Sequence, residues 1–311
     1  MADRKKILVI GGANMSLVAN MYKIPNPGER ICDDGGVAYI PGGDGVSYSS
    51  ALAAMGADAV ILSKLGADVH GQKLYRFCKD GGVDTSCLRV DHDHQTGFTL
   101  IIRDGEGEDH TVIYPGANGF VTNDALMEAF SQEADAVYIG LDLPFPTVLA
   151  AARIAADRGL PIFMDGSLSG KDYELENLPE IEVFTVNEAE ALGYTDIAPG
   201  SMESSLRVSL AIGRRIKCKN VVIKQGARGA FVYDGKRYNT VPAYRSANVQ
   251  IQGAARYAFA SAMILEYLLS GDIRGAVKYG CAAGSLARAR AGALNTPTLA
   301  EVEELVFSQQ K

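Results

Sequence analysis

The sequence predicts an α/β fold with a mostly parallel central sheet. Short apolar runs alternate with helical patterns, the first such run lies close to the N-terminus, and two stretches of strand composition interrupt the alternation. Of the 311 residues, 47% are hydrophobic and 22% are charged, which is typical of a soluble globular protein and not of a disordered chain. A chain of this length can bury a single large core.

The apolar runs that predict strands are, in order, residues 5–12, 58–66, 134–142, 160–166, 182–187 and 220–226. Helical patterns cover residues 45–56 and 145–159, and three more close the chain at 253–271, 273–292 and 298–309. Because strands and helices alternate, we expect the strands to lie parallel with helices covering the sheet.

Two stretches, at about residues 30–43 and 96–118, have strand composition but do not fit this alternation. The second contains the sequence DGEG at residues 104–107, which predicts a hairpin turn. Strands inserted into an α/β core predict a small β-sheet lid, and ligands of such folds bind beyond the carboxyl ends of the sheet strands. We therefore expect one domain, residues 1–311, with a lid over its ligand site.

Charge and composition exclude several classes of partner. A net charge of −7 without a basic block argues against nucleic acid or an anionic membrane as partner. The apolar runs are shorter than a membrane span and residues 1–12 lack a signal-peptide pattern, so the sequence predicts a cytoplasmic protein.

The five cysteines and four histidines do not form a recognisable site. The cysteines are odd in number and lack CxxC spacing, so we interpret them as reduced thiols. The histidines lack metal-ligand spacing, so no intrinsic metal is expected, although a metal site in the acidic loop at residues 90–94 stays open as an alternative.

A turn of small residues precedes the long helix near residue 253. Gly253, Ala254 and Ala255 would leave backbone N–H groups accessible to an anion at the helix N-terminus. Taken alone, the same turn is explained by close packing at a helix start. The next residue is Arg256, whereas a phosphate-transfer site needs a carboxylate there.

Several segments follow one another in a specific order. They are NPGER, PGGDGVSYSSALAAMGADAVILSKLGADVHG with Gly66, Asp68 and Gly71, then YPGAN, TVNEAEAL, KQGARGAF and GAARYAFASAMILEYLLSG. In this order they resemble the ribokinase (PfkB) family of sugar and nucleoside kinases, from residue 7 to about residue 307. The resemblance implies a ribokinase-like three-layer α/β/α fold with a small β-sheet lid. It also implies ATP-dependent phosphorylation of a hydroxyl group with Mg²⁺.

The resemblance assigns the catalytic motif of the family, G-A-G-D, to the segment G-A-A-R. It implies that Gly253, Ala254 and Ala255 form the anion hole and that Arg256 stands where an aspartate takes the proton of the acceptor. A guanidinium accepts no hydrogen bond and stays protonated, so Arg256 cannot be that base. Since a positioned base contributes about 10²- to 10⁴-fold in rate, we expect impaired catalysis.

The resemblance places the sugar-like acceptor at Asn14, Ser16, Gly42, Gly43, Asp44 and Ser47. Asp44 replaces a lysine of the family, so the charges at positions 44 and 256 are both reversed. We therefore predict that Asp44 and Arg256 face each other, the alternative being two solvated surface charges. Gln250 brings no charge to the position that helps to hold a monovalent cation in ribokinase-like members.

The nucleotide side keeps more of the family pattern. The resemblance assigns ATP and Mg²⁺ to Asn187, Glu190, Lys224, Gly226, Gly229 and Cys281, with residues 293–298 near the adenine. Lys224 stands where many members have threonine. Asn187 and Glu190 also fit the capping of a helix, which is the alternative interpretation of that pair.

Three interpretations remain. We favour a ribokinase-like protein that binds nucleotide and sugar-like ligand but has lost efficient phosphotransfer, as a non-enzymatic ligand-binding or regulatory protein would. The second is an active sugar kinase with an unusual acceptor and another base, such as Asp68 or Asp165. The third is a deliberately redesigned site, since positions 16, 44, 47, 250, 255 and 256 all differ from the family. The apolar residues 36–40 are compatible with the homodimer that family members often form through the lid.

Overall fold

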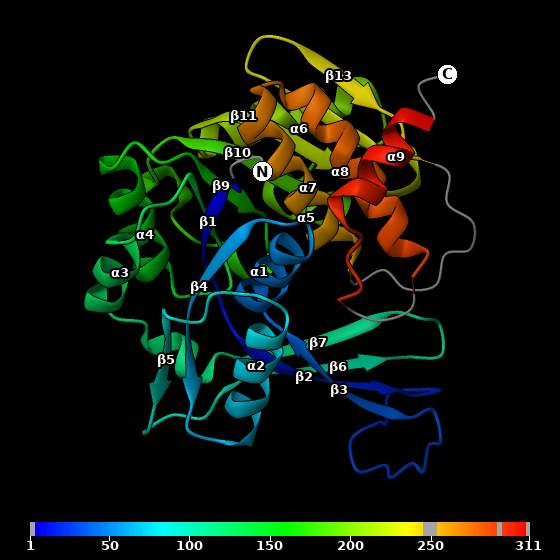
Figure 1. Ribbon diagram of the computed structural model, residues 1–311. Coiled ribbons are helices and arrows are strands. Elements are labelled where there is room, and N and C mark those ends of the chain that lie inside the picture. The colour runs from blue at the N-terminus through cyan, green and yellow to red at the C-terminus, as the bar shows by residue number, and fades with distance from the viewer. Residues whose placement is uncertain (1–3, 245–253, 291–293, 309–311) are drawn as a thin grey trace.

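The computed structural model describes residues 4–244, 254–290 and 294–308, and its centre is a nine-stranded sheet (Figure 1). The strand order is β13-β12-β11-β10-β9-β8-β1-β4-β5. All neighbours from β11 to β5 are parallel, and only the pairs β11–β12 and β12–β13 are antiparallel, so the mostly parallel sheet is confirmed. The strands are β1 (Lys6–Ile10), β4 (Asp58–Gly66), β5 (Leu88–Asp91), β8 (Ala136–Ile139), β9 (Ile162–Asp165), β10 (Ile181–Asn187), β11 (Cys218–Lys224), β12 (Ala230–Tyr233) and β13 (Tyr238–Val241).

Helices cover both faces of this sheet. They are α1 (Asp44–Ala54), α2 (Val69–Asp80), α3 (Asn123–Phe130), α4 (Phe145–Asp157), α5 (Glu188–Thr195), α6 (Met202–Arg215), α7 (Ala255–Ser270), α8 (Ile273–Arg288) and α9 (Leu299–Ser308). Successive residues of β1 face opposite sides: Ile7 and Val9 pack with α1, α7 and α8, whereas Leu8 and Ile10 pack with the α3–α6 side. This alternation follows from the two-residue period of a strand and confirms three layers.

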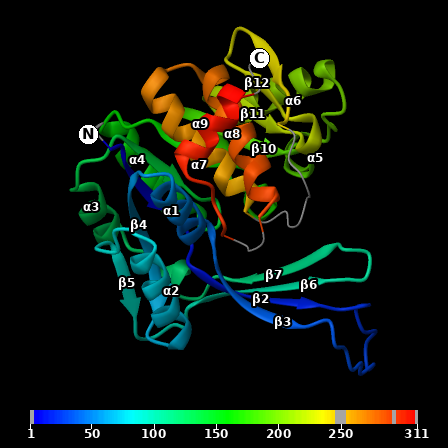
Figure 2. The same ribbon diagram turned by 45° about the vertical axis from the view of Figure 1, so that its right-hand side comes forward.

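A smaller sheet of four strands projects from the main body (Figure 2). Its order is β3-β2-β6-β7, formed by β2 (Asn14–Asn20), β3 (Val37–Gly42), β6 (Gly97–Arg103) and β7 (Asp109–Tyr114). The predicted hairpin turn is confirmed, since the N–H of Gly107 donates to the carbonyl of Asp104 and Gly107 has φ of +84°.

One strand of the smaller sheet was missed, and the bounds predicted for another were wrong. Its first strand, β2, was not predicted, because Asn14–Asn20 mixes polar and apolar residues and directly follows the Gly11–Gly12 break after β1. The predicted lid strand at 30–43 is regular only at Val37–Gly42, since residues 30–36 form no strand. In the main body, strands β5, β12 and β13 and helices α2, α3, α5 and α6 were also not predicted as full elements.

Two further observations concern the described part of the chain. None of its helices combines the length and the apolar character that crossing a membrane requires. The structure pairs none of the five cysteines, all of which it describes, and only Cys32 is exposed.

Candidate active site

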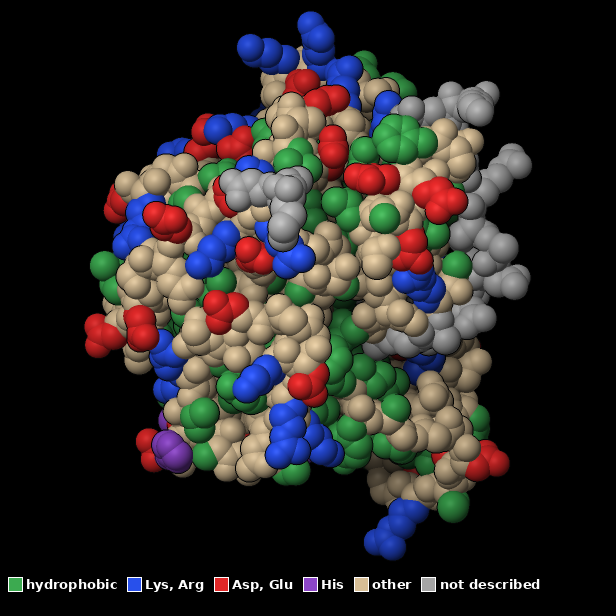
Figure 3. Space-filling model, in the orientation of Figure 1, with side chains coloured by type: hydrophobic (Ala, Val, Ile, Leu, Met, Phe, Trp, Pro, Cys, Tyr) green, Lys and Arg blue, Asp and Glu red, His purple; other side chains and the backbone are tan. Residues whose placement is uncertain are grey.

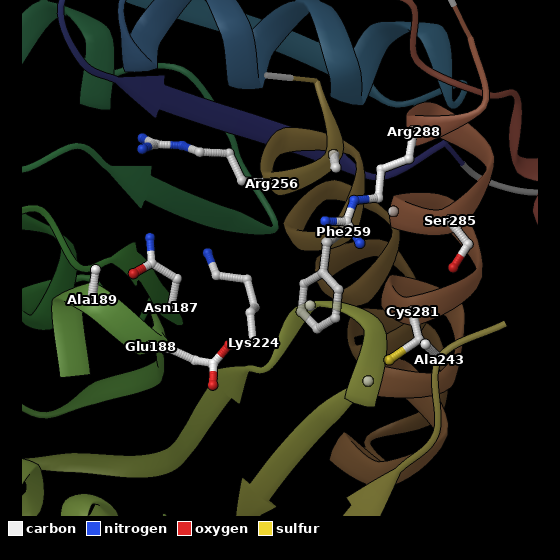
Figure 4. A pocket seen from close by; sticks show the side chains of 14 residues that line it. Asn187, Glu188, Ala189, Lys224, Ala243, Arg256, Phe259, Cys281, Ser285 and Arg288 are labelled. Carbon is white, nitrogen blue, oxygen red and sulfur yellow. The ribbon is translucent and has the colours of Figure 1, made fainter. Parts of the chain in front are cut away.

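Two cavities lie next to each other beyond the carboxyl ends of the sheet strands. The nucleotide-side cavity, of about 510 Å³, is bounded by α5, β11, α7 and α8, and its walls include the predicted residues Asn187, Lys224, Gly226, Gly229, Ala255 and Cys281 (Figure 4). The acceptor-side cavity, of about 370 Å³, lies between all four strands of the smaller sheet and the main body. Its walls include every predicted acceptor residue: Asn14, Ser16, Gly42, Gly43, Asp44 and Ser47. All the predicted acceptor residues and most of the predicted nucleotide residues thus line two adjoining cavities.

Arg256 lines both cavities and joins them. It lies in the first turn of α7, and its Nη2 donates to Oδ1 of Asp44 over 2.5 Å. The Asp44 side chain is 8% exposed and the Arg256 side chain 33%, so this pair is largely removed from water. The guanidinium also lies over the ring of Tyr257, 4.7 Å from its centre. The predicted pairing of Asp44 with Arg256 is therefore confirmed, and the alternative of two solvated charges is wrong.

The backbone before α1 fixes the position of Asp44. Gly43 has φ of +85°, and a Cβ there would lie 2.3 Å from the carbonyl oxygen of Gly12, so only glycine fits. Asp142, which sequence reasoning missed, accepts hydrogen bonds from the N–H groups of Asp44 (2.8 Å) and Gly12 (3.0 Å). Asp142 follows β8 and also lines the acceptor-side cavity. Its position after a predicted strand was the one available signal.

Burial changes the ionisation of both carboxyl groups. It raises the pKa of Asp44 to about 7, although the guanidinium of Arg256 opposes that rise. Burial also raises the pKa of Asp142, and its two backbone donors oppose that effect. Two carboxyl groups and one guanidinium thus share a site with little water, where Asp44 titrates near neutral pH.

Lys224 enters the nucleotide-side cavity from the end of β11. Its Nζ donates to Oδ2 of Asp165 over 2.8 Å and to Oγ1 of Thr185 over 3.3 Å. The hydroxyl of Tyr48 donates to the same Asp165 oxygen. Asp165 is 2% exposed and lines neither cavity, so it acts here as a buried counterion of Lys224. The ammonium group is held where it can meet an anion in the cavity.

Asn187 and Glu190 form the helix cap that was the alternative interpretation of this pair. The side chain of Asn187 accepts from the N–H of Glu190, and Glu190 accepts from the N–H of Asn187, which is a capping box at the start of α5. Asn187 also lines the nucleotide-side cavity, but Glu190 does not and is 5% exposed. A role of Glu190 toward Mg²⁺ stays a prediction.

Other predicted positions are placed as follows. Ala254 is the residue before α7, whereas Gly253 and Gln250 lie outside the described residues. Asp68 caps α2, accepting from Gly71 and Thr96, and lines neither cavity. Of the segment expected near the adenine, Leu294 lines the acceptor-side cavity instead.

The sequence was compared with known protein families. The profile of the pfkB family of carbohydrate kinases matches residues 4–299. The chain belongs to this family.

Its relatives include sugar kinases. The bifunctional ribokinase/ribose-5-phosphate isomerase A of Fructilactobacillus sanfranciscensis is 30% identical over 98% of the pfkB-family chain, which spans 57% of the length of that protein. The ribokinase of Staphylococcus aureus is 26% identical over 96% of the chain and 99% of its own length.

Solved structures share the architecture. A ribokinase from Giardia lamblia matches with a TM-score of 0.88 at 21% identity, over 99% of this chain and 100% of that one. A ribokinase from Arabidopsis thaliana, solved with ribose and ATP, matches with a TM-score of 0.83 at 21% identity, over 98% of this chain and 99% of that one. These likenesses confirm the ribokinase-like fold.

Proposed function

We propose that this pfkB-family protein binds a nucleoside triphosphate in the nucleotide-side cavity and a sugar-like compound in the acceptor-side cavity, and that it transfers phosphate poorly. The observation that carries the proposal is the position of Arg256, which lines both cavities with its guanidinium bonded to Asp44. A hydroxyl group in one cavity would meet a phosphate in the other at this side chain.

The nucleotide-side cavity has the charge that phosphates need. Lys224 and Arg256 present cations from two different elements, and cations that face a phosphate group form strong charge-assisted hydrogen bonds. Mg²⁺ is usually held by the substrate phosphates, water and one or two protein oxygens, and Asn187 and Glu188 supply oxygens in this wall. When bound, the metal would neutralise phosphate charge.

The site lacks, at position 256, a base that could take the proton from the acceptor hydroxyl. Position 256, where the family resemblance expects the carboxylate, holds a guanidinium that cannot accept a proton. Loss of a positioned base costs about 10²- to 10⁴-fold in rate. A protein that binds both ligands and rarely reacts them would serve as a ligand-binding or regulatory protein.

One observation favours an active kinase as the second candidate. The carboxyl group of Asp44 lines the acceptor-side cavity, and burial raises its pKa to about 7, close to the value that suits a general base at neutral pH. Asp68 and Asp165, the earlier candidates, line neither cavity. The bond between Asp44 and Arg256 opposes this role, because a paired carboxylate is a weaker base.

Binding and turnover test the proposal separately. Calorimetric titration with a non-hydrolysable ATP analogue and Mg²⁺ should show binding, and a Lys224→Met variant, which keeps the length of the side chain without its charge, should bind more weakly. ATP turnover with D-ribose as acceptor should be far below the roughly 1–100 s⁻¹ of kinases. Turnover in that range would reject impaired catalysis, and an absence of nucleotide binding would reject the nucleotide site.

We also propose that two copies of the chain associate through the smaller sheet. Hydrophobic side chains gather over this sheet (Figure 3), and Val37, Tyr39, Val112 and Tyr114 are all exposed in the single chain. Burial of these side chains against a second copy would remove them from water. Sedimentation of the protein and of a Val37→Lys/Tyr39→Lys variant should show a dimer for the first only.

A further inference from the structure

Helix α8 turns one polar face toward the nucleotide-side cavity. Cys281, Ser285 and Arg288 follow one another at spacings of four and three residues, which places them on the same side of a helix, and all three line the cavity. Figure 4 shows Cys281 and Ser285 on the opposite side of the cavity from Arg256, with the Arg288 side chain reaching from α8 toward Phe259 of α7. The cavity therefore has a phosphate end at Lys224 and Arg256 and a second end at α8.

The hydrogen-bonding groups at the α8 end are available to a ligand. Among the described residues, neither the guanidinium of Arg288 nor the hydroxyl of Ser285 has a hydrogen-bond partner, and Ser285 is only 9% exposed. By contrast, Lys224 is bonded to Asp165 and Arg256 to Asp44. The sequence stretches 245–253 and 291–293 contain no Asp or Glu that could neutralise Arg288. Arg288 is partly exposed and lines the cavity, so a ligand bound there can supply acceptors in place of water.

The side chains at the α8 end offer mainly hydrogen-bond donors to a ligand. Arg288 carries five N–H donors and no acceptor. Burial raises the pKa of Cys281 to about 12, so its sulfur stays a thiol at neutral pH and offers no negative charge. Phe259, 6% exposed, supplies an apolar surface between the two ends. A planar ring with two acceptors on one edge would fit this arrangement.

We propose that Arg288 makes this cavity selective for a nucleotide whose base is a 6-oxopurine, guanine or hypoxanthine, over adenine. The proposal rests on the proposed function, because it requires a nucleotide whose phosphates lie at Lys224 and Arg256. Guanine presents the acceptors O6 and N7 on one edge, and the fork of an arginine binds both at once. Adenine presents N7 beside the N6 amino group, which is a donor and faces a donor in Arg288.

Nucleoside diphosphates test the selectivity without a reaction. ADP, GDP and IDP are titrated calorimetrically in the presence of Mg²⁺ into the unaltered protein and into Arg288→Met, Arg288→Lys and Arg214→Met variants. Arg214 is an exposed arginine in the last turn of α6 and lines neither cavity, so its variant controls for the loss of one charge. Thermal unfolding of each variant checks that it is folded.

The expected result is that GDP and IDP bind roughly tenfold more tightly than ADP, as a bidentate arginine contact would give. This preference should persist in Arg214→Met and disappear in Arg288→Met and in Arg288→Lys, which keeps the charge but not the fork. Equal or tighter binding of ADP would overturn the selectivity while the proposed nucleotide site stands. A preference that survives in Arg288→Met or in Arg288→Lys would also overturn it, and a failure of all three diphosphates to bind would reject both proposals.

Discussion

The guanidinium of Arg256 lies 2.5 Å from the carboxyl group of Asp44, although 212 positions separate the two residues in the chain. The bond joins the first turn of α7 to the first residue of α1 at the junction of the two cavities. Each residue has a charge opposite to the one that the family resemblance implies for its position. The two changes are therefore compensating, because either alone would leave a largely buried charge without its partner.

A double-mutant cycle should show this coupling. Asp44→Ala and Arg256→Ala are each expected to lower the free energy of unfolding by about 1–3 kcal/mol, because each leaves a charged group with little access to water. The double variant should lose less than the sum, by about 0.5–3 kcal/mol. Urea unfolding of the four proteins measures this. Additive effects would show that the pair contributes no coupling energy.

The raised pKa of Asp44 predicts a specific pH dependence of stability. The group titrates near 3.8 when unfolded and near 7 when folded, so the folded state keeps a proton that the unfolded state loses between these values. Its contribution to stability is therefore complete below about pH 4 and decreases as the pH rises to about 7. Relative to Asp44→Asn, the unaltered protein should lose at most about 1.4 kcal/mol per pH unit in this range.

Urea unfolding at several pH values, with Asp157→Asn as a control, measures that difference. Asp157 is an exposed residue at the end of α4, so its variant removes one carboxyl group without changing the site. A constant difference between the unaltered protein and Asp44→Asn across this pH range would contradict the raised pKa.

Two buried tyrosines, Tyr48 and Tyr138, stack on each other, and replacement of each by phenylalanine should change stability differently. Tyr48 and Tyr138 have ring centres 3.8 Å apart, but only the Tyr48 hydroxyl has a partner, Asp165, while that of Tyr138 has none among the described residues. Tyr48→Phe should cost about 1–3 kcal/mol, because a buried carboxylate loses a donor. Tyr138→Phe should be neutral or stabilising. Equal losses in urea unfolding would show that packing, and not the hydrogen bond, decides both.

The sequence was sufficient for six strands of the sheet because they are continuous apolar runs that need burial on both faces. It did not predict β5, β12 or β13 at the two sides of the sheet. It did not identify β2, whose residues mix polar and apolar types and pair with β3 and β6 of the smaller sheet, with Met15 packing into the core. The Asp44–Arg256 pair could be predicted because both residues carry the charge opposite to the one that the family has at the same position, and both positions belong to one site. Asp142 and Arg288 could not, since an isolated acid after a strand and a basic residue late in a helix become site residues only when distant segments fold together.

Restoration of the charges that the family resemblance implies should increase phosphotransfer. An Asp44→Lys/Arg256→Asp double variant would place a carboxylate at the start of α7 and a cation opposite it. With ATP, Mg²⁺ and D-ribose, we expect its turnover to exceed that of the unaltered protein by up to about 10²- to 10⁴-fold, the contribution of a positioned base. Arg256→Asp alone should gain less and be less stable, because its new carboxylate would face Asp44 and like charges disfavour ionisation.

A Lys224→Met change added to the double variant is the matched control, since Lys224 is expected to bind phosphate and not to take the proton. It should abolish the gain while α1 and α7 keep their new charges. If the double variant binds nucleotide and gains no turnover, the loss of catalysis extends beyond position 256, to the acceptor side at Ser16 and Ser47 or to the altered anion hole. If the unaltered protein is already as fast as the double variant, Arg256 is compatible with catalysis and Asp44 becomes the base to test.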